Sequence, residues 1–449
     1  MRFAVPQQVS EAVDTLEKHG FHAFLVGGCV RDDLLNIRPH DYDVTTDALP
    51  DQIKQAFSGR TLILAGEKHG TVAAVIDGMV VEMTTFRVDG AYFDGRHPAS
   101  VTFTSRLEDD LARRDFTINA MAWSKQTGLV DPFGGQKDCA LSLIRCVGDP
   151  ETRLTEDALR ILRGMRFSSR FGFSIEEKTA RAMRALCGRL KLVSRERVAA
   201  ELTGILSGAG AENVLCAFSD VLGAAVPELI PMFSCPQNSV YHVYDVWRHT
   251  LRTLSLITPR TPLTVYAALL HDCGKPASRE RDARGFDHFH GHQERGAALA
   301  ESIMRTLKLP VRLIRDVCLL ILHHDDDISV RTVRLLLHLL GPELFDSLLA
   351  LRRADMLAHA PFVAERAAAL QLVAQEKERV LREGLCYSLS ALRIDGRALM
   401  RMGFRSDAIG EELNRLLYLV MTDALPNEET ALLKLAESDA RNAAAEMKD

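Results

Sequence analysis

The chain has 449 residues, of which 47% are hydrophobic and 26% charged, and its formal net charge is −5. This length exceeds what one hydrophobic core supports, so several domains are expected, and the composition excludes an extensively disordered chain. The acidic balance argues against a protein that coats nucleic acid without specificity, although it leaves room for a local basic groove.

No apolar stretch is long enough to span a bilayer, so we expect no membrane association. The nine cysteines are scattered and include no C-x-x-C pair, which argues against a disulfide framework and against a zinc ribbon. A reducing, cytoplasmic location fits this pattern best.

The predicted elements change character along the chain. Strand and helix signals are mixed at first, and from about residue 156 the pattern is almost wholly helical. This predicts an α+β protein, with a mixed α/β head on a small sheet followed by helical regions. We expect four parts, divided as 1–145 (head), 146–230 (helical neck), 231–365 (histidine-rich helical region) and 366–449 (C-terminal helical region).

The head begins with an amphipathic helix over residues 10–19 that ends at Gly20. A strand, FHAFLVGG, then runs into a glycine turn. Further on, the runs TVAAVI and MVVEMTTF flank Asp77-Gly78, which is a strong signal for a β-hairpin.

Two aspartates follow the glycine turn. If residues 41–44 form a strand, Asp41 and Asp43 point to the same face, where two carboxylates are tolerated around a divalent cation such as Mg²⁺. Such a site suits two-metal phosphoryl transfer. Glu82, on a strand between apolar neighbours, is a weaker candidate for a third carboxylate. A lone D-x-D is usually a solvated turn, but the preceding glycine-rich motif makes that interpretation much weaker here.

That motif is G-G-x-x-R-D. Gly27 and Gly28 carry no side chains, so their backbone N–H groups can approach a phosphate at the start of a short helix. Arg31, one turn further on, would add positive charge.

A second basic segment begins with RRDFTINA at residue 113 and continues with TEDALRILRGMRF at residue 155. Thr155 and the two acids after it predict a helix start. Along that helix Asp157, Arg160, Arg163 and Arg166 recur every three residues and would share one face. A surface ladder of ion pairs explains this stripe equally well. The functional alternative is that Asp157 and Arg160 read the edge of a base while the other arginines meet phosphates.

Five segments in order resemble the successive motifs of the class II tRNA nucleotidyltransferases, the bacterial CCA-adding enzymes and their poly(A) polymerase relatives. They are LVGGCVRDDLLNIRPHDYDVTTDA, RRDFTINAMAW, DPFGGQKD, TEDALRILRGMRF and SRERVAAELTGIL, and they cover roughly residues 20–210. The resemblance implies a nucleotidyltransferase head and a helical neck. It also implies addition of CCA, from CTP and ATP, to tRNA whose 3′ end lacks all or part of that sequence.

The resemblance also implies roles for single residues. Asp41 and Asp43 would hold Mg²⁺, and Asp157 with Arg160 would act as a protein template for CTP and ATP. The candidate nucleotide-binding residues are Gly27, Gly28, Arg31, Arg114, Asn119, Asp157, Arg160, Arg163 and Arg166.

The template has a chemical basis. Cytosine and adenine both present an amino donor beside a ring-nitrogen acceptor, which a carboxylate and a guanidinium can match. Guanine and uracil would leave charged groups unpaired in a dry pocket, which is costly. The segment RVDGAYFDGRHPASVTF resembles the flexible loop that enzymes adding all of CCA use when they switch from C to A; an ordinary surface loop is the alternative.

Ten of the fifteen histidines fall between residues 240 and 360. His271-Asp272 ends an apolar helix, with His249 before it and Asp355 far behind. This arrangement resembles an HD domain, in which these four residues bind a transition metal or Mg²⁺. His292 and His324 would extend the site to a second metal.

The alternative for these histidines is a structural role in the helical core. Some bacterial CCA-adding enzymes carry such a domain, associated with phosphohydrolase or cyclic phosphodiesterase activity on RNA ends. The C-terminal region, 366–449, has no chemical motif and is expected to bind tRNA or to form a dimer contact.

Two alternative functions stay open. A poly(A) polymerase or an enzyme that adds only A would share the fold, although the acidic balance disfavours a polymerase that works on varied transcripts. The chain could instead be mainly an HD-domain metal-dependent phosphohydrolase whose head only binds RNA. The intact pair Asp41 and Asp43 argues against that hypothesis.

Overall fold

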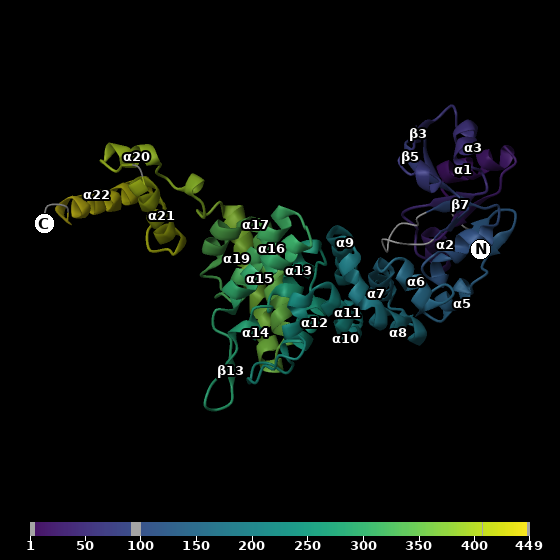
Figure 1. Cartoon of the computed structure of the whole chain (residues 1–449). Helices are drawn as coiled ribbons and strands as arrows, with labels where there is room; N and C mark the ends of the chain where they lie inside the picture. The colour runs from purple at the N-terminus through teal and green to yellow at the C-terminus, as the bar shows by residue number, and fades with distance from the viewer. Residues whose placement is uncertain (1–4, 91–99, 406, 447–449) are drawn as a thin grey trace. The chain divides into compact units, whose positions relative to one another are not determined.

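The computed structural model describes residues 5–90, 100–405 and 407–446. The chain divides into two compact units, Met1–Ile230 and Pro231–Asp449. The predicted α+β class is confirmed, because the main sheet lies in the first unit and the described part of the second is helical apart from one two-stranded ribbon (Figure 1). Among the residues described, no helix is both long and apolar enough to cross a membrane.

A seven-stranded sheet forms the centre of the head, in the order β3-β4-β5-β2-β1-β8-β9. Neighbouring strands are antiparallel except β2 and β5, which are parallel. All four residues of β1 are buried, because this strand lies inside the sheet and the helices that precede and follow it in the chain pack against it. The strands are β1 (Ala23–Val26), β2 (Asp43–Thr46), β3 (Thr61–Ile63), β4 (Thr71–Ile76), β5 (Met79–Thr85), β8 (Ala122–Ser124) and β9 (Gly128–Val130).

The predicted hairpin is confirmed. β4 and β5 pair up to Ile76 and Met79, so Asp77 and Gly78 form a two-residue turn. Both turn residues have positive φ, 46° and 82°, as the tight turns that match the twist of a hairpin require.

Short helices surround this sheet. The amphipathic helix α1 (Gln7–Lys18) begins earlier than predicted and buries Val9, Ala12, Val13 and Leu16; with α3 (Pro50–Ala56) it packs on the sheet. The other elements of the head are α2 (Gly28–Leu34), η1 (Glu67–His69), the ribbon β6 (Arg87–Asp89) and β7 (Val101–Phe103), α4 (Leu107–Ala112), η2 (Thr117–Asn119) and α5 (Gly135–Ala140). The tip of the predicted flexible loop, residues 91–99, lies outside the described residues.

The neck corrects one prediction. Thr155 does not begin a helix, because it lies inside α6 (Pro150–Glu156), whose N-cap is Asp149. Asp157 is extended, and its side chain accepts a hydrogen bond from the backbone N–H of Leu159, where α7 (Leu159–Phe171) begins. The remaining elements of the first unit are β10 (Leu143–Ile144), β11 (Ser174–Ile175), α8 (Glu177–Leu186), η3 (Cys187–Leu192), α9 (Arg195–Ser207), α10 (Ala211–Ala217) and α11 (Ser219–Ala225), with η4 (Pro227–Met232) at the boundary of the two units.

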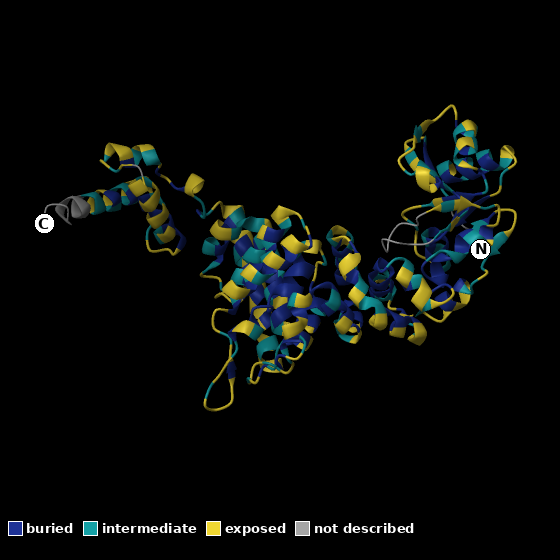
Figure 2. Ribbon diagram, viewed as in Figure 1, coloured by how far each residue is buried: buried dark blue, intermediate teal, exposed yellow. Residues whose placement is uncertain are grey.

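The second unit buries its apolar side chains between packed helices (Figure 2). Its first helices are α12 (Val246–Leu256), α13 (Pro262–Leu270), α14 (Lys275–Ser278), α15 (His292–Thr306), α16 (Val311–His323), α17 (Val333–Ala358), α18 (Pro361–Ala364), η5 (Glu365–Ala369) and α19 (Leu370–Glu383), with the ribbon β12 (Glu280–Arg281) and β13 (Asp287–His288). Another apolar cluster joins α20 (Gly396–Arg401), α21 (Asp407–Met421) and α22 (Glu429–Glu446) with Cys386, Leu392 and Ile394, which flank η6 (Leu389–Ala391).

Candidate functional sites

One pocket of about 590 Å³ in the first unit collects most of the residues predicted for nucleotide binding and catalysis. The predicted residues that line it are Gly27, Gly28, Arg31, Asp41, Asp43, Arg114, Asn119, Asp157, Arg160, Arg163 and Arg166. Glu82 is not among them. It is exposed on β5 and lies directly opposite Asp43 in the register of β2 and β5, so the two side chains share one face of the sheet.

The two aspartates sit where the strand begins rather than within it. β2 starts at Asp43, so the predicted strand over 41–44 is wrong at its N-terminal end, and Asp41 lies in the preceding segment. Partial desolvation by the pocket walls raises the pKa of Asp43, and the negative charge of Asp41 adds to this, while Arg114 opposes it. Two carboxylates that repel each other in this way fit a cation site.

The glycine turn leaves room for an arginine. Gly27 has a φ of 76°, and a Cβ atom on it would lie 2.9 Å from Nη1 of Arg114. A side chain at this position would therefore displace the Arg114 guanidinium. Glycine at this position thus allows the Arg114 guanidinium to approach the backbone closely, and it also tolerates the positive φ.

The pocket arginines are held by acidic partners. Arg31 pairs with Asp32 at 2.6 Å and also donates to Asn119. Arg163 pairs with Asp115 at 2.8 Å. On the neck, the other ion pairs are Arg160–Glu156 at 2.6 Å, Arg166–Glu201 at 2.6 Å and Arg197–Asp157 at 2.9 Å.

The structure revises the prediction that Asp157, Arg160, Arg163 and Arg166 form a stripe on one helix. The stripe does not run along one helix, because Asp157 precedes α7, yet all four of its members line the same pocket. Arg160 is 9% exposed and donates to Glu156, to the carbonyl of Arg153 and to the carbonyl of Arg113. A guanidinium anchored in this way presents a fixed edge to a ligand.

Sequence reasoning missed several residues of this pocket. The additional lining residues include Asp32, Arg113, Asp115, Arg170 and Arg197. Asp115 stood inside the motif RRDFTINA without an assigned role. Its carboxylate joins η2 to the neck, because it accepts hydrogen bonds from both Asn119 and Arg163.

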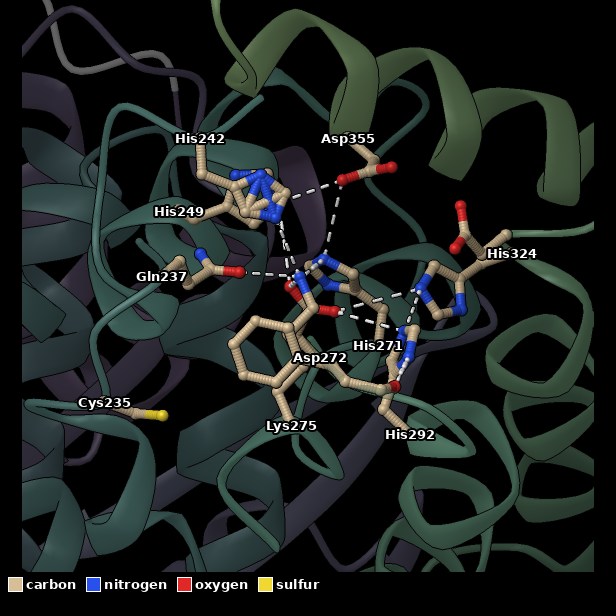
Figure 3. Close-up of polar contacts among 12 residues, drawn as sticks. Cys235, Gln237, His242, His249, His271, Asp272, Lys275, His292, His324 and Asp355 are labelled. Carbon is tan, nitrogen blue, oxygen red and sulfur yellow. Dashed lines mark hydrogen bonds and ion pairs between the residues drawn. The ribbon is translucent and has the colours of Figure 1, made fainter. Parts of the chain in front are cut away.

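The second unit contains two groups of buried side chains that could hold metal ions. One consists of His249, His271 and Asp355, and the other of Asp272, His292 and His324 (Figure 3). In each group the candidate ligand atoms lie within 4.8 Å of one another.

Asp272 connects the two groups. Its Oδ2 lies 3.2 Å from Nε2 of His271. Its Oδ1 lies 3.8 Å from Nε2 of His292 and 3.8 Å from Nε2 of His324. One carboxylate oxygen thus faces each group, so Asp272 is placed to bridge two ions.

The donor atoms fit metal ligation. The Nδ1 atoms of His271, His292 and His324 lie 2.9, 2.9 and 2.6 Å from backbone carbonyls three residues earlier. Because a carbonyl only accepts, these Nδ1 atoms carry the proton and the Nε2 atoms are left free to bind a cation. Burial lowers the pKa of His324 to about 4, whereas at His271 the charges of Asp272 and Asp355 outweigh burial and raise the pKa. Nε2 of His271 and Oδ1 of Asp272 are buried without a hydrogen-bond partner, while Oδ2 of Asp272 forms an ion pair with Nζ of Lys275 at 2.8 Å.

The helices explain this convergence. His249 lies within α12, His271 follows α13, and His292 and His324 mark the first turn of α15 and the end of α16. A pocket of about 690 Å³ opens onto both groups, and its walls add residues not predicted from the sequence, among them Tyr241, His242, Lys275, Phe286, Phe289 and His359.

Three stretches of the chain match models of known families. Residues 23–145 match the poly A polymerase head domain, residues 172–218 match the probable RNA and SrmB-binding site of polymerase A, and residues 241–376 match the HD domain.

Curated relatives agree over the N-terminal half. A CCA-adding enzyme of Geobacillus sp. (strain WCH70) is 44% identical over 209 residues, which is 46% of this chain and 51% of that protein. A CCA-adding enzyme of Staphylococcus saprophyticus is 40% identical over 258 residues, which is 58% of this chain and 60% of that protein. The chain thus matches between about half and three fifths of the length of these relatives.

Solved structures extend the similarity to the whole fold. The Bacillus stearothermophilus CCA-adding enzyme in complex with CTP has a TM-score of 0.75 and 26% identity, with 99% of each chain covered. The Thermotoga maritima CCA-adding enzyme complexed with tRNA has the same fold at a TM-score of 0.63 and 20% identity, over 97% of this chain and 96% of that one. The resemblance seen in the motifs is thereby confirmed: the chain is similar to CCA-adding enzymes, in sequence over its N-terminal half and in fold over its length, and residues 241–376 match the HD domain.

Proposed function

We propose that this protein is a template-independent tRNA nucleotidyltransferase that adds CCA to tRNA 3′ ends from CTP and ATP. The observation that carries the proposal is one pocket in the first unit, which brings Asp41 and Asp43 together with the arginines of the head and neck. The relatives and solved structures named CCA-adding enzyme support the same activity.

In this proposal Asp41 and Asp43 hold Mg²⁺, and Glu82 is close enough in register to assist. Bound Mg²⁺ would supply activation of the RNA 3′ hydroxyl and neutralisation of the triphosphate. The chain's own contribution is to orient the nucleotide. Arg31 and Arg114 place positive charge beside the glycine turn, where the triphosphate would lie.

Base selection is assigned to Asp157 and Arg160. Both line the pocket, and each is fixed by a partner on the neck, Arg197 and Glu156 respectively. The anchored carboxylate and guanidinium would match the donor–acceptor edge of C or A. With G or U bound, the charged groups of Asp157 and Arg160 would be left unpaired. Arg160→Ala is therefore expected to relax selectivity more than it weakens triphosphate binding.

The test is end-group sequencing of a tRNA transcript that lacks CCA, after incubation with the protein, Mg²⁺, CTP and ATP. A discrete CCA end supports the proposal. A single A added only to a transcript ending in CC would identify an A-adding enzyme, and a long A ladder would identify a poly(A) polymerase. Either result would overturn the proposal, as would no extension at all.

A second function is favoured by the two metal-ligand groups in the HD domain. We propose that they hold two ions, of Mg²⁺ or a transition metal, and that this site hydrolyses phosphate esters. Two observations support this proposal: Asp272 lies between the two ligand groups, and Nε2 of His271 is buried without a hydrogen-bond partner. Metal analysis of the purified protein tests the ions, and release of phosphate from 2′,3′-cyclic nucleotides tests the hydrolysis. His271→Ala should abolish that release and leave CCA addition intact.

The remaining assignments are also proposals. We retain the four-part division at 145, 230 and 365, in which 366–449 contributes to tRNA binding. Since the proposed substrates are tRNA, CTP and ATP, the proposed place of action is the cytoplasm.

A further inference from the structure

A buried carboxylate lies behind the nucleotide pocket. Asp110, on α4, is 0% exposed and does not line the pocket. Its Oδ1 accepts two hydrogen bonds from Arg113, at 2.7 and 3.0 Å. Its Oδ2 accepts one from Nη2 of Arg114 and one from Oγ1 of Thr45, both at 3.3 Å.

The position of the Arg114 guanidinium depends on the carboxylate of Asp110. Within the described part of the chain, Asp110 is the one acceptor that the Arg114 guanidinium contacts by a hydrogen bond. The opposite side of the guanidinium faces Gly27, where the missing side chain leaves 2.9 Å between Nη1 and an ideal Cβ position. Arg31 and Arg163 differ, because each has its own acidic partner inside the pocket.

Asp110 also connects Arg114 to β2, the strand that begins at the proposed metal ligand Asp43. Thr45 lies two residues after Asp43 on β2, so the two side chains share one face of the strand. The Thr45 hydroxyl lies 3.1 Å from the carbonyl oxygen of Thr84 and 3.3 Å from Oδ2 of Asp110, so the two acceptors share its one proton and the carboxylate is linked to β2 near Asp43. Arg114, on the other side of the carboxylate, is close enough to act on the charge of Asp43.

We propose that Asp110 is a positioning residue that holds Arg114 at the triphosphate subsite, between Gly27 and Asp43. The inference rests on the proposed function, namely that this pocket binds CTP and ATP. A free arginine side chain samples many rotamers, and a charge-assisted hydrogen bond to a fixed carboxylate removes that freedom before the nucleotide arrives.

The test is a double-mutant cycle on nucleotide binding. The dissociation constant of CTP with Mg²⁺ is measured by calorimetry for the full chain, so that variants without catalytic activity remain measurable. Asp110→Asn should weaken CTP binding by about tenfold, the scale of one lost hydrogen bond to a charged group. In an Arg114→Ala background the same substitution should change binding by less than about twofold. An equal loss in both backgrounds would overturn the proposal.

A matched control separates positioning from stability. Asp287, on β13, is also buried and also pairs with two arginines, Arg279 and Arg281, but it belongs to the second unit. Asp287→Asn should lower the melting temperature and leave the dissociation constant of CTP unchanged. If it weakens CTP binding as Asp110→Asn does, general destabilisation explains both results and the proposal fails.

Thr45→Val provides a milder variant should Asp110→Asn not fold. It removes a hydrogen bond to the same oxygen that holds Arg114. Its effect on CTP binding should again vanish in Arg114→Ala, and no effect at all would overturn the proposal. Absence of CTP binding by the unaltered protein would instead refute the proposed function, so the two failures are distinguishable.

Discussion

Asp115 offers a direct test of how the head and neck are joined at the pocket. Its carboxylate is 7% exposed and accepts hydrogen bonds from the backbone N–H of Phe116 at 2.8 Å and from the side chain of Asn119 at 3.0 Å. It also pairs with Arg163 on α7 at 2.8 Å. Asp115→Asn keeps the shape of the side chain and removes its charge.

The expected cost follows from burial. Removing one partner of a buried ion pair costs about 3–5 kcal/mol, but the Arg163 side chain is 35% exposed and solvent screens part of the interaction. We therefore expect a loss of about 2–3 kcal/mol. For a unit of this size, that corresponds to a fall in melting temperature of roughly 4–12 °C.

The pH dependence of this loss has a defined sign. Burial alone would raise the pKa of Asp115, but Arg163 and Asn119 outweigh it and hold the pKa well below its usual range. The stabilisation is thus complete above the unfolded pKa of about 4 and declines as the pH falls below it. The difference in melting temperature between the parent protein and Asp115→Asn should therefore become smaller as the pH falls below this value.

Differential scanning calorimetry of both proteins between neutral and acid pH measures this effect. Combining Asp115→Asn with Arg163→Met should recover part of the stability, since loss of both charges leaves no unpaired ion. A melting temperature unchanged within about 1 °C at neutral pH would refute the reasoning, because the ion pair would then contribute nothing.

Three further outcomes are expected. Asp43→Asn should reduce nucleotide addition by more than about a hundredfold with little change in melting temperature, since it removes a metal ligand from an accessible position; retained addition would exclude this metal site. Gly27→Ala should weaken CTP binding and lower stability by about 1 kcal/mol or more, because its φ is 76° and the new Cβ meets Arg114; unchanged CTP binding would mean that the guanidinium shifts freely. Asp272→Asn should lower the metal content of both groups, as measured by elemental analysis, while CCA addition stays within about twofold; a full complement of metal would show that Asp272 is not shared.

Local sequence determined the elements that carry the sites. The hairpin at Asp77-Gly78 was predictable because turn chemistry depends on two adjacent residues. The apolar helix that ends at His271 was predictable for a similar reason, since α13 is continuously hydrophobic. The helix boundary at Asp157 was not, because Asp157 is extended between α6 and α7 and its side chain bonds to the nearby backbone N–H of Leu159, which the regular spacing of acids and arginines does not reveal.

The sequence by itself also determined which residue types belong to each site. Asp43, Arg31 and the arginines of the neck were predicted as one nucleotide site, and the structure places them in one pocket. That prediction rested on the resemblance of the ordered motifs to the class II tRNA nucleotidyltransferases, because the spacing of Asp157 and the arginines alone also fitted a surface ladder of ion pairs.

Only the tertiary structure decided which groups meet. Arg163 and Asp115 are 48 residues apart in the sequence, and Arg31 and Asn119 are 88 apart. Sequence periodicity reports on neighbours within one element. The Arg163–Asp115 pair instead forms where the neck packs against the head, and the Arg31–Asn119 pair forms where α2 packs against η2 within the head. The same reason explains Asp110, whose two arginine partners are local but whose link to β2 is made by Thr45, 65 residues away. The division of the histidines into two groups that share Asp272 likewise depends on how four helices pack together.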